Sequence, residues 1–285
     1  MAIASIKAKL IPSGTFVLRF LPRRLAIVIA YVVADVCGML DRARRHAIDD
    51  NLARTAPLTG AAERRRLRRA TFRHFAAVWV DFLRVPFLPR GAILDLVRWN
   101  GRRNLDAALE QGKGVVIVTA HVGALDLAGI YLAACGYPIS VVVEDLDPPL
   151  HRVWSRYRAS TGMRVLSRRQ GATSAFRALK RGEIVALVAD RLIDGPRLEV
   201  DFCGDRRVIP SGPAALARWI GARILVLQIA RRPDGSGYEL TTEPASSPIG
   251  TSEDITRSIA RHLTRIVRRY PDQWFVFDAG WIGTR

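Results

Sequence analysis

From residue 112 onward the sequence alternates between short apolar runs and helical patterns, and this alternation constrains the fold most. The first run, Val115-Val-Ile-Val-Thr119, is rich in β-branched residues and predicts a strand buried on both faces. Further strands are expected at 139–143, 184–189, 198–202, 224–229, 238–242 and 274–277, and helices at 124–134, 148–161, 173–180, 212–220 and 252–270. We therefore expect an α/β fold with a central, largely parallel or mixed sheet flanked by helices.

The length of the chain limits the number of domains. Its 285 residues, 49% of them hydrophobic, can bury a substantial core in one α/β domain or at most two small ones. No internal repeat and no linker rich in proline and serine divides the sequence. We therefore predict one catalytic domain over residues 46–285, preceded by a helical segment over residues 1–45.

The charge of the chain indicates an anionic partner. There are 44 Lys and Arg against 26 Asp and Glu, a formal net charge of +18, which suits nucleic acid, a membrane surface or a phosphorylated substrate. Zinc-finger spacing, a helix-turn-helix signature and an RNA-binding aromatic motif are all missing from the sequence. We therefore expect no nucleic-acid partner.

An apolar run at residues 25–40 favours the membrane surface. The run includes Asp35, and its length of roughly 16 residues is short of the roughly 20 that a spanning helix needs. Arginines flank it on both sides, which is typical of a helix lying in an anionic leaflet, although an ordinary buried helix fits too. Residues 61–84 form a basic amphipathic pattern that suits either a membrane surface or a solvated charged face. We expect residues 1–45 to associate with a membrane.

The segment Thr119-Ala-His121-Val-Gly-Ala-Leu-Asp126 is the main candidate for a catalytic site. His121 falls just beyond the C-terminal end of the strand at 115–119, where open α/β sheets bind their ligands. If a helix begins near Gly123, His121 lies in the preceding loop and can turn back toward Asp126. A carboxylate fixes the tautomer of a neutral imidazole, which can then remove a proton from a hydroxyl. A structural histidine at a helix N-terminus is the alternative, because this spacing alone is weakly specific.

Other chemistries find little support in the sequence. It contains no GxxxxGK[ST] phosphate loop, no GxSxG nucleophile motif and no convincing spacing of metal ligands. Gly112-Lys-Gly114 precedes a strand, whereas a dinucleotide-binding loop follows one. We therefore expect neither a metal ion nor a bound cofactor.

Several motifs occur in a characteristic order from about Leu21 to Trp281. They are Asn51-Leu-Ala-Arg-Thr-Ala-Pro57, Phe72-Arg-His74, His121 with Asp126, Tyr157-Arg158, Ala189-Asp190-Arg191, Glu199-Val-Asp-Phe-Cys-Gly204, Ile209-Pro-Ser-Gly-Pro-Ala214 and Tyr270-Pro-Asp-Gln-Trp274. In this order they resemble the lysophospholipid-acyltransferase superfamily. Within it the chain is most similar to the bacterial lipid A biosynthesis acyltransferases, a branch that includes phosphatidylinositol mannoside acyltransferases.

The resemblance implies a function for the whole chain. Residues 46–285 would form an acyltransferase domain that moves a fatty acyl group from acyl-CoA or acyl carrier protein to a hydroxyl of a glycolipid. The protein would be peripheral or monotopic at the cytoplasmic face of the plasma (inner) membrane. A thioester is already activated, so the reaction needs a positioned base and oxyanion donors but no cofactor.

The resemblance also implies roles for individual residues. His121 would be the general base, Asp126 its orienting partner, and Glu199 an acidic residue that approaches the histidine. The residues expected to bind the acceptor are Glu144, Arg158, Asp190 and Arg191, with the Arg158 guanidinium anchoring phosphate or sugar groups.

Two departures from the family pattern leave the acceptor open. Cys203 stands where relatives have a second aromatic residue, and Phe277-Asp278 stands where many lipid A enzymes have an aromatic residue followed by histidine. The second departure weakens assignment to the lipid A branch. The acceptor could therefore be a mannosylated phosphatidylinositol, a lipid A precursor or another glycolipid. The alternative function is a non-catalytic protein that binds anionic lipid and retains the fold.

Overall fold

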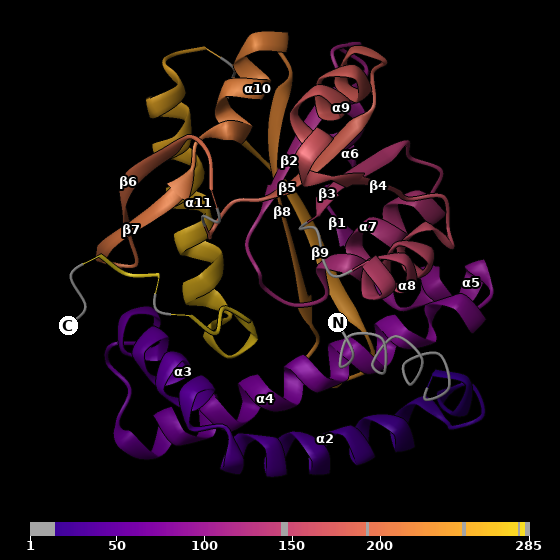
Figure 1. Cartoon of the computed structure of the whole chain (residues 1–285), viewed down its shortest axis with the longest axis vertical. Helices are drawn as coiled ribbons and strands as arrows, with labels where there is room; N and C mark the ends of the chain where they lie inside the picture. Colours follow the sequence, from indigo (N-terminus) through magenta and orange to yellow (C-terminus); the bar gives the residue numbers. More distant parts are fainter. Residues whose placement is uncertain (1–14, 144–147, 192–193, 247–248, 279, 283–285) are drawn as a thin grey trace.

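A mixed sheet forms the centre of the computed structural model, which describes residues 15–143, 148–191, 194–246, 249–278 and 280–282. In this part of the chain the sheet has seven strands in the order β1-β9-β8-β2-β5-β3-β4 (Figure 1). They are β1 (Val97–Asn100), β2 (Val115–Thr119), β3 (Ile139–Val143), β4 (Arg164–Ser167), β5 (Ile184–Val188), β8 (Arg223–Arg231) and β9 (Tyr238–Ser246). The strands from β8 to β4 are parallel, whereas β9 runs antiparallel to β8 and pairs in parallel with β1. The predicted α/β class with a central, largely parallel or mixed sheet is confirmed, and the membrane association of the N-terminal segment stays a prediction.

Helices cover both faces of this sheet. One face carries α9 (Arg168–Lys180), α10 (Gly212–Ile220) and α11 (Ser252–Arg269), and the other carries α5 (Arg90–Asp95), α6 (Arg102–Leu109), α7 (Leu125–Ala134) and α8 (Pro148–Ala159). Strand β2 shows why two layers are needed, because successive side chains of a strand point to opposite faces. Val116 and Val118 belong to the core under α9–α11, and Val115 and Ile117 to the core under α5–α8.

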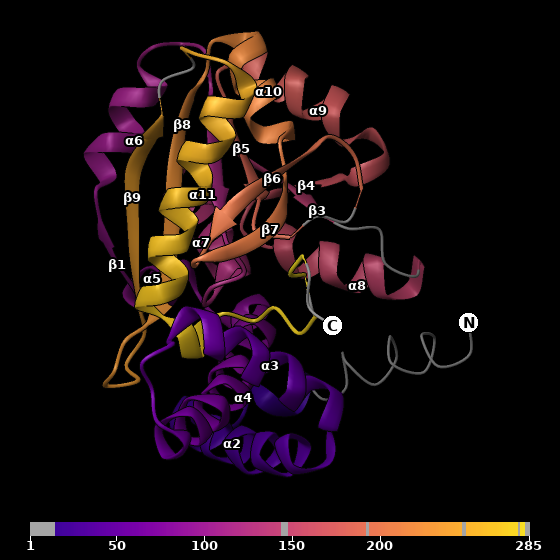
Figure 2. The ribbon, with the colours of Figure 1, turned by 90° about the vertical axis from the view of Figure 1, so that its left-hand side faces the viewer.

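Three N-terminal helices form a separate layer at one end of the sheet, seen along the bottom of Figures 1 and 2. They are α2 (Arg23–Leu40), α3 (Arg42–Thr55) and α4 (Ala61–Arg84), and a short 3-10 turn, η1 (Val85–Phe87), follows. Ala26 near the start of α2 packs with Val80 near the end of α4, and Ala34 packs with Phe72, so α2 and α4 are antiparallel. None of the helices in the described residues has the length and apolar character needed to cross a membrane.

One side of α2 is apolar and exposed, and we call it the α2 apolar face. Its members are Leu25, Val28, Ile29, Val32, Val33, Val36, Met39 and Leu40, all at least 47% exposed. Their spacing by three and four residues places them along one stripe of the helix. Asp35, on another side of α2, accepts hydrogen bonds from Arg69 and Arg73. Part of the basic surface of α4 is therefore paired with a carboxylate of α2, although the Arg69 side chain is still 60% exposed.

The structure differs from the sequence-based prediction in several short elements. Residues 198–202 lie in a separate antiparallel hairpin of β6 (Arg197–Phe202) and β7 (Asp205–Pro210). Residues 274–277, predicted as a final strand, instead follow the 3-10 turn η2 (Pro271–Gln273) as an extended segment with a single bridge to the sheet end, Val122 to Trp274. In the described residues this segment makes only that one bridge and does not pair with a strand along its length. The proposed division at residue 45 falls inside α3 and stays a prediction.

Candidate active site

His121 lies in the loop between β2 and α7. The C-terminal segment around residues 273–275 is hydrogen-bonded to this loop. The backbone N–H of Phe275 donates to the carbonyl of His121 at 2.8 Å, and that of Gly123 donates to the carbonyl of Gln273 at 2.9 Å. Gly123 has φ +66°, and an added Cβ would lie 1.9 Å from the carbonyl oxygen of Ile229. Only glycine fits there, so the turn that presents His121 depends on it.

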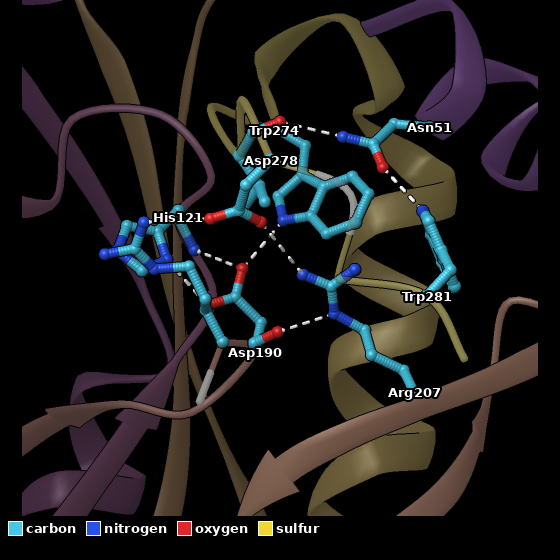
Figure 3. Close-up of polar contacts among 9 residues, drawn as sticks. Asn51, His121, Asp190, Arg207, Trp274, Asp278 and Trp281 are labelled. Atoms are coloured by element: carbon cyan, nitrogen blue, oxygen red, sulfur yellow. Dashed lines mark hydrogen bonds and ion pairs between the residues drawn. The ribbon is translucent and has the colours of Figure 1, made fainter. Parts of the chain in front are cut away.

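Asp190 is the hydrogen-bonded carboxylate partner of His121 (Figure 3). Thr119 in β2 pairs with Val188 in β5, so His121 and Asp190, each two residues farther on, emerge together from adjacent strands. His121 Nδ1 lies 2.7 Å from Asp190 Oδ1. Asp190 Oδ2 also accepts from the backbone N–H of His121 at 2.9 Å and from Trp274 Nε1 at 2.7 Å.

These contacts determine the charge of Asp190, which is 0% exposed. Burial alone would raise its pKa, but the His121 ring and the hydrogen bonds from His121 and Trp274 outweigh burial and lower the pKa to about 2. At neutral pH Asp190 is therefore an ionised group that only accepts hydrogen bonds, which makes Nδ1 of His121 the donor. Nε2 is then the ring nitrogen able to take a proton, on a side chain 31% exposed.

The structure places Asp126 beside Arg158 and not beside His121, in contrast to the predicted pairing. It lies in the first turn of α7 and accepts from Arg158 at the end of α8, with Arg158 Nε 2.6 Å from Asp126 Oδ1. Within the described residues no hydrogen bond joins Asp126 to His121. The physical reason is that Asp190, on an adjacent strand end, occupies the position beside Nδ1. The two predicted site residues Asp126 and Arg158 are thus brought together as an ion pair.

The other predicted site residues are distributed unevenly. Glu199 is on the outward side of β6 and pairs with Arg206 Nη2 at 2.6 Å, and in the described residues no hydrogen bond or ion pair joins it to His121. It alternates with Val200 and Phe202, which point into the core, so its side chain faces away. Arg191 Nη1 donates to Asp278 Oδ2 at 3.0 Å. Glu144 lies outside the described residues.

A layer of side chains behind Asp190 has no role assigned from the sequence. Arg207 donates from Nε to the Asp190 carbonyl at 2.9 Å, and Trp281 donates to Asn51 Oδ1 at 2.8 Å (Figure 3). Asn51 Nδ2 in turn donates to the carbonyl of Val276 at 2.7 Å. Asn51 falls within a motif noted in the sequence, but nothing in the spacing of these residues indicates that they meet behind Asp190. The one signal in the sequence is that His121 and Asp190 each follow closely on a predicted strand, at 115–119 and 184–189.

In the described residues, no group of three or more His, Cys, Asp and Glu side chains could hold a metal ion. The candidate site therefore consists of the buried carboxylate of Asp190, the ring of His121, and the Asp126–Arg158 ion pair. Such a pair of His and Asp is the unit that takes a proton from a hydroxyl and stabilises the resulting imidazolium.

Comparison with known proteins identifies the family of the chain. The sequence pattern of the bacterial lipid A biosynthesis acyltransferases matches residues 8–282. The chain therefore belongs to the bacterial lipid A biosynthesis acyltransferase family, and it is an acyltransferase.

Individual relatives have two kinds of name. The chain is 30% identical to a phosphatidylinositol mannoside acyltransferase of Mycolicibacterium smegmatis, over 81% of this chain and 78% of the relative. It is also 30% identical to the protein of that name from Mycobacterium tuberculosis, over 81% and 75% of the two chains. A lipid A biosynthesis palmitoleoyltransferase of Escherichia coli is 25% identical, over 79% and 74%.

Proposed function

We propose that this acyltransferase moves a fatty acyl group from an acyl thioester, carried by coenzyme A or acyl carrier protein, to a hydroxyl of a glycolipid. The observation that carries the proposal is the hydrogen-bonded pair of His121 and Asp190 at the ends of adjacent parallel strands. This is where open α/β sheets bind ligands. An intact pair does not favour the alternative of a non-catalytic lipid-binding protein.

The proposed reaction uses His121 twice. Nε2 of His121 accepts the proton of the acceptor hydroxyl while the oxygen attacks the thioester carbonyl. The tetrahedral intermediate then loses the thiolate as the C–S bond breaks, and the imidazolium returns the proton to sulfur. Asp190 keeps the ring in the productive tautomer and stabilises the imidazolium between the two steps. No covalent acyl-enzyme and no resident cofactor enter this scheme.

The Asp126–Arg158 pair is proposed to bind the acceptor. Arg158 is 16% exposed and Asp126 is 33% exposed, so both side chains can be reached at the surface. A guanidinium held by one carboxylate is preoriented to present its remaining N–H groups to a phosphate or sugar. Arg191 and Glu144 remain proposed members of the same acceptor site.

A phosphatidylinositol mannoside is the acceptor class we favour over a lipid A precursor. The relatives named for phosphatidylinositol mannoside are 30% identical, and the palmitoleoyltransferase is 25% identical. Asp278 also supports this choice, because it pairs with Arg191 where many lipid A enzymes carry histidine.

The α2 apolar face is proposed to lie in the cytoplasmic leaflet of the plasma (inner) membrane. A continuous exposed apolar stripe on a monomer typically marks an interaction surface, and the net charge of +18 suits anionic lipid. Phe75 of α4 packs against Phe275 and Phe277, which places the His121 loop on the side of the sheet that faces α4 and α2. Docking through α2 would hold the site close to its lipid acceptor. The first 14 residues of the predicted membrane segment lie outside the described residues.

An acyl-transfer assay with matched histidine variants tests the proposal. Palmitoyl-CoA and palmitoyl acyl carrier protein are offered with a phosphatidylinositol mannoside or a lipid A precursor, in detergent. We expect His121→Ala to lower the turnover about 10²- to 10⁴-fold, because the general base is lost. His46→Ala, which removes an exposed histidine on α3, is the control and should match the wild-type protein.

Two results would contradict the proposal. Equal transfer by wild type and His121→Ala would remove His121 from the mechanism. No transfer to any lipid by wild type, with both proteins bound equally to liposomes, would favour the lipid-binding alternative.

A further inference from the structure

Arg207 in β7 is a cation enclosed by aromatic rings. The residue is 1% exposed, and its guanidinium carbon lies 4.9 Å from the ring centre of Trp281 and 5.2 Å from that of Trp274. The ring of Phe202 lies at 6.0 Å. The fourth side is closed by Gly280, where an added Cβ would lie 2.5 Å from Nη2. Three aromatic rings and the backbone at Gly280 therefore surround this guanidinium closely.

The hydrogen bonding of Arg207 is incomplete. Its Nε donates to the carbonyl of Asp190 at 2.9 Å, but Nη1 and Nη2 are buried and make no hydrogen bond within the described residues. The carboxylate of Asp278 approaches Nη2 only to 3.9 Å. Burial accordingly lowers the pKa of Arg207. A buried cation with one hydrogen bond is an unfavourable way to fill space, since an apolar side chain would cost less.

Both the hydrogen bond and the charge of Arg207 are directed at Asp190. The carbonyl that accepts from Nε belongs to the residue whose carboxylate holds His121. We propose that Arg207 is a positioning residue, which fixes the Asp190 main chain and balances the carboxylate charge so that His121 stays neutral and able to accept a proton. This inference rests on the proposed function, in which His121 is the base.

The sign of the electrostatic effect follows from the groups that face this cation. They are Asp190 after β5, Asp278 in the C-terminal segment, Cys203 in the β6–β7 turn and Arg191, which follows Asp190. The carboxylate of Asp190 in turn contacts the His121 ring. A positive charge near an imidazole disfavours the imidazolium, whereas Asp190 and Asp278 favour it. Removing the Arg207 charge therefore raises the pKa of His121, and more of the base is protonated at neutral pH.

Three variants separate positioning from simple packing. Arg207→Met removes the charge with similar length, and Arg207→Lys keeps a charge without the Nε contact. Arg206→Met is the matched control, because Arg206 is the preceding residue of the same strand and its side chain is 61% exposed. The full-length protein in detergent is labelled with ¹⁵N-histidine, and the His121 signal is assigned by its loss in His121→Ala. The ring titration and the pH profile of kcat/KM are then measured.

In Arg207→Met we expect the His121 titration midpoint and the acid limb of kcat/KM to move together to higher pH by about one unit. At a pH below both midpoints this shift lowers kcat/KM about tenfold. Arg207→Lys should keep the midpoint near that of wild type but have a lower kcat, because the Asp190 carbonyl is no longer held. Arg206→Met should change neither quantity.

Other outcomes overturn the inference. An unmoved midpoint in a folded Arg207→Met protein would leave Arg207 a packing residue. If Arg207→Met does not fold, an unchanged kcat in Arg207→Lys would likewise show that Arg207 is only a packing residue. The NMR titration needs no substrate, so absence of transfer by the wild-type protein would count against the proposed function while leaving the effect of Arg207 on His121 measurable.

Discussion

Asp190 accepts three hydrogen bonds from two residues that are far apart in the sequence. The ring and main chain of His121 supply two, and Trp274 supplies the third. Since an aspartate that accepts several hydrogen bonds is both ionised and immobile, it can fix the tautomer of the imidazole. We therefore propose for Asp190 the orienting role that the resemblance gives to Asp126.

Asp190→Asn is expected to lower kcat about 10²- to 10⁴-fold without unfolding the protein. The asparagine amide can donate to Nδ1, which places the ring proton on Nε2 and leaves no base toward the substrate. Glu199→Gln should retain kcat within about twofold, because an exposed ion pair contributes little. Steady-state transfer assays on both variants check this. Equal losses in the two would restore Glu199 to the mechanism and weaken the case for Asp190.

The site was predictable only in part. The sequence predicts His121 as a site residue because the strand before it is a clear β-branched run. It also predicts Asp190 as a site residue, but not that Asp190 is hydrogen-bonded to His121. Which strands become neighbours depends on sheet order, and β2 lies beside β5 and not beside β3. That order follows from the packing of helices over the whole sheet, which local patterns do not contain. Arg207 could not be found, because a single arginine among 44 basic residues carries no signal of burial.

At the scale of elements, ion pairs hold α2 to the rest of the protein at two places. Near its start, Arg23 donates to both oxygens of Asp81, at 2.7 and 2.8 Å, and Tyr238 of β9 donates to the same carboxylate at 2.7 Å. Farther along, Asp35 pairs with Arg69 and Arg73 on a more exposed surface. The Asp81 side chain is only 2% exposed, so it ties α2, α4 and β9 together in the interior.

Asp81→Asn is expected to lower the free energy of unfolding by about 3 kcal/mol, because it leaves Arg23 partly buried without its counter-charge. Asp35→Asn should cost about 1 kcal/mol or less. Thermal unfolding followed by circular dichroism, in the same detergent, compares the two variants. Similar losses would mean that the Arg23–Asp81 pair is worth no more than a surface pair.

Elements with strong patterns were predicted and short ones were not. The helix at 61–84 and the strands at 115–119 and 139–143 coincide with α4, β2 and β3. Strands β1 and β4 have four residues each, too few for a periodic pattern to stand out. The run at 274–277 is apolar because Trp274 and Val276 are buried across the sheet end, so its composition resembles that of a strand.

For the whole molecule, the α2 apolar face and the positive charge together predict reversible binding to anionic vesicles. Val32→Glu combined with Met39→Glu is expected to lower the partition coefficient at least tenfold, because two exposed apolar contacts are replaced by charges repelled by the lipid. Leu58→Glu is the control, since Leu58 is fully exposed outside α2. Co-sedimentation with vesicles containing phosphatidylglycerol measures the effect. An equal decrease of the partition coefficient in the control and the double variant would show that net charge, and not the α2 apolar face, determines binding.

The order of the strands has a consequence for how the chain is made. Strand β1 pairs with β9, and every strand from β2 to β8 is synthesised between them. As the chain leaves the ribosome, β1 has an open edge until residues 238–246 emerge, and unpaired strand edges promote aggregation. Because β1 must wait for so distant a partner, this edge of the sheet is completed late and folding is slow. We therefore expect nascent chains of this enzyme to need more protection by chaperones than those of a protein whose neighbouring strands are made one after another.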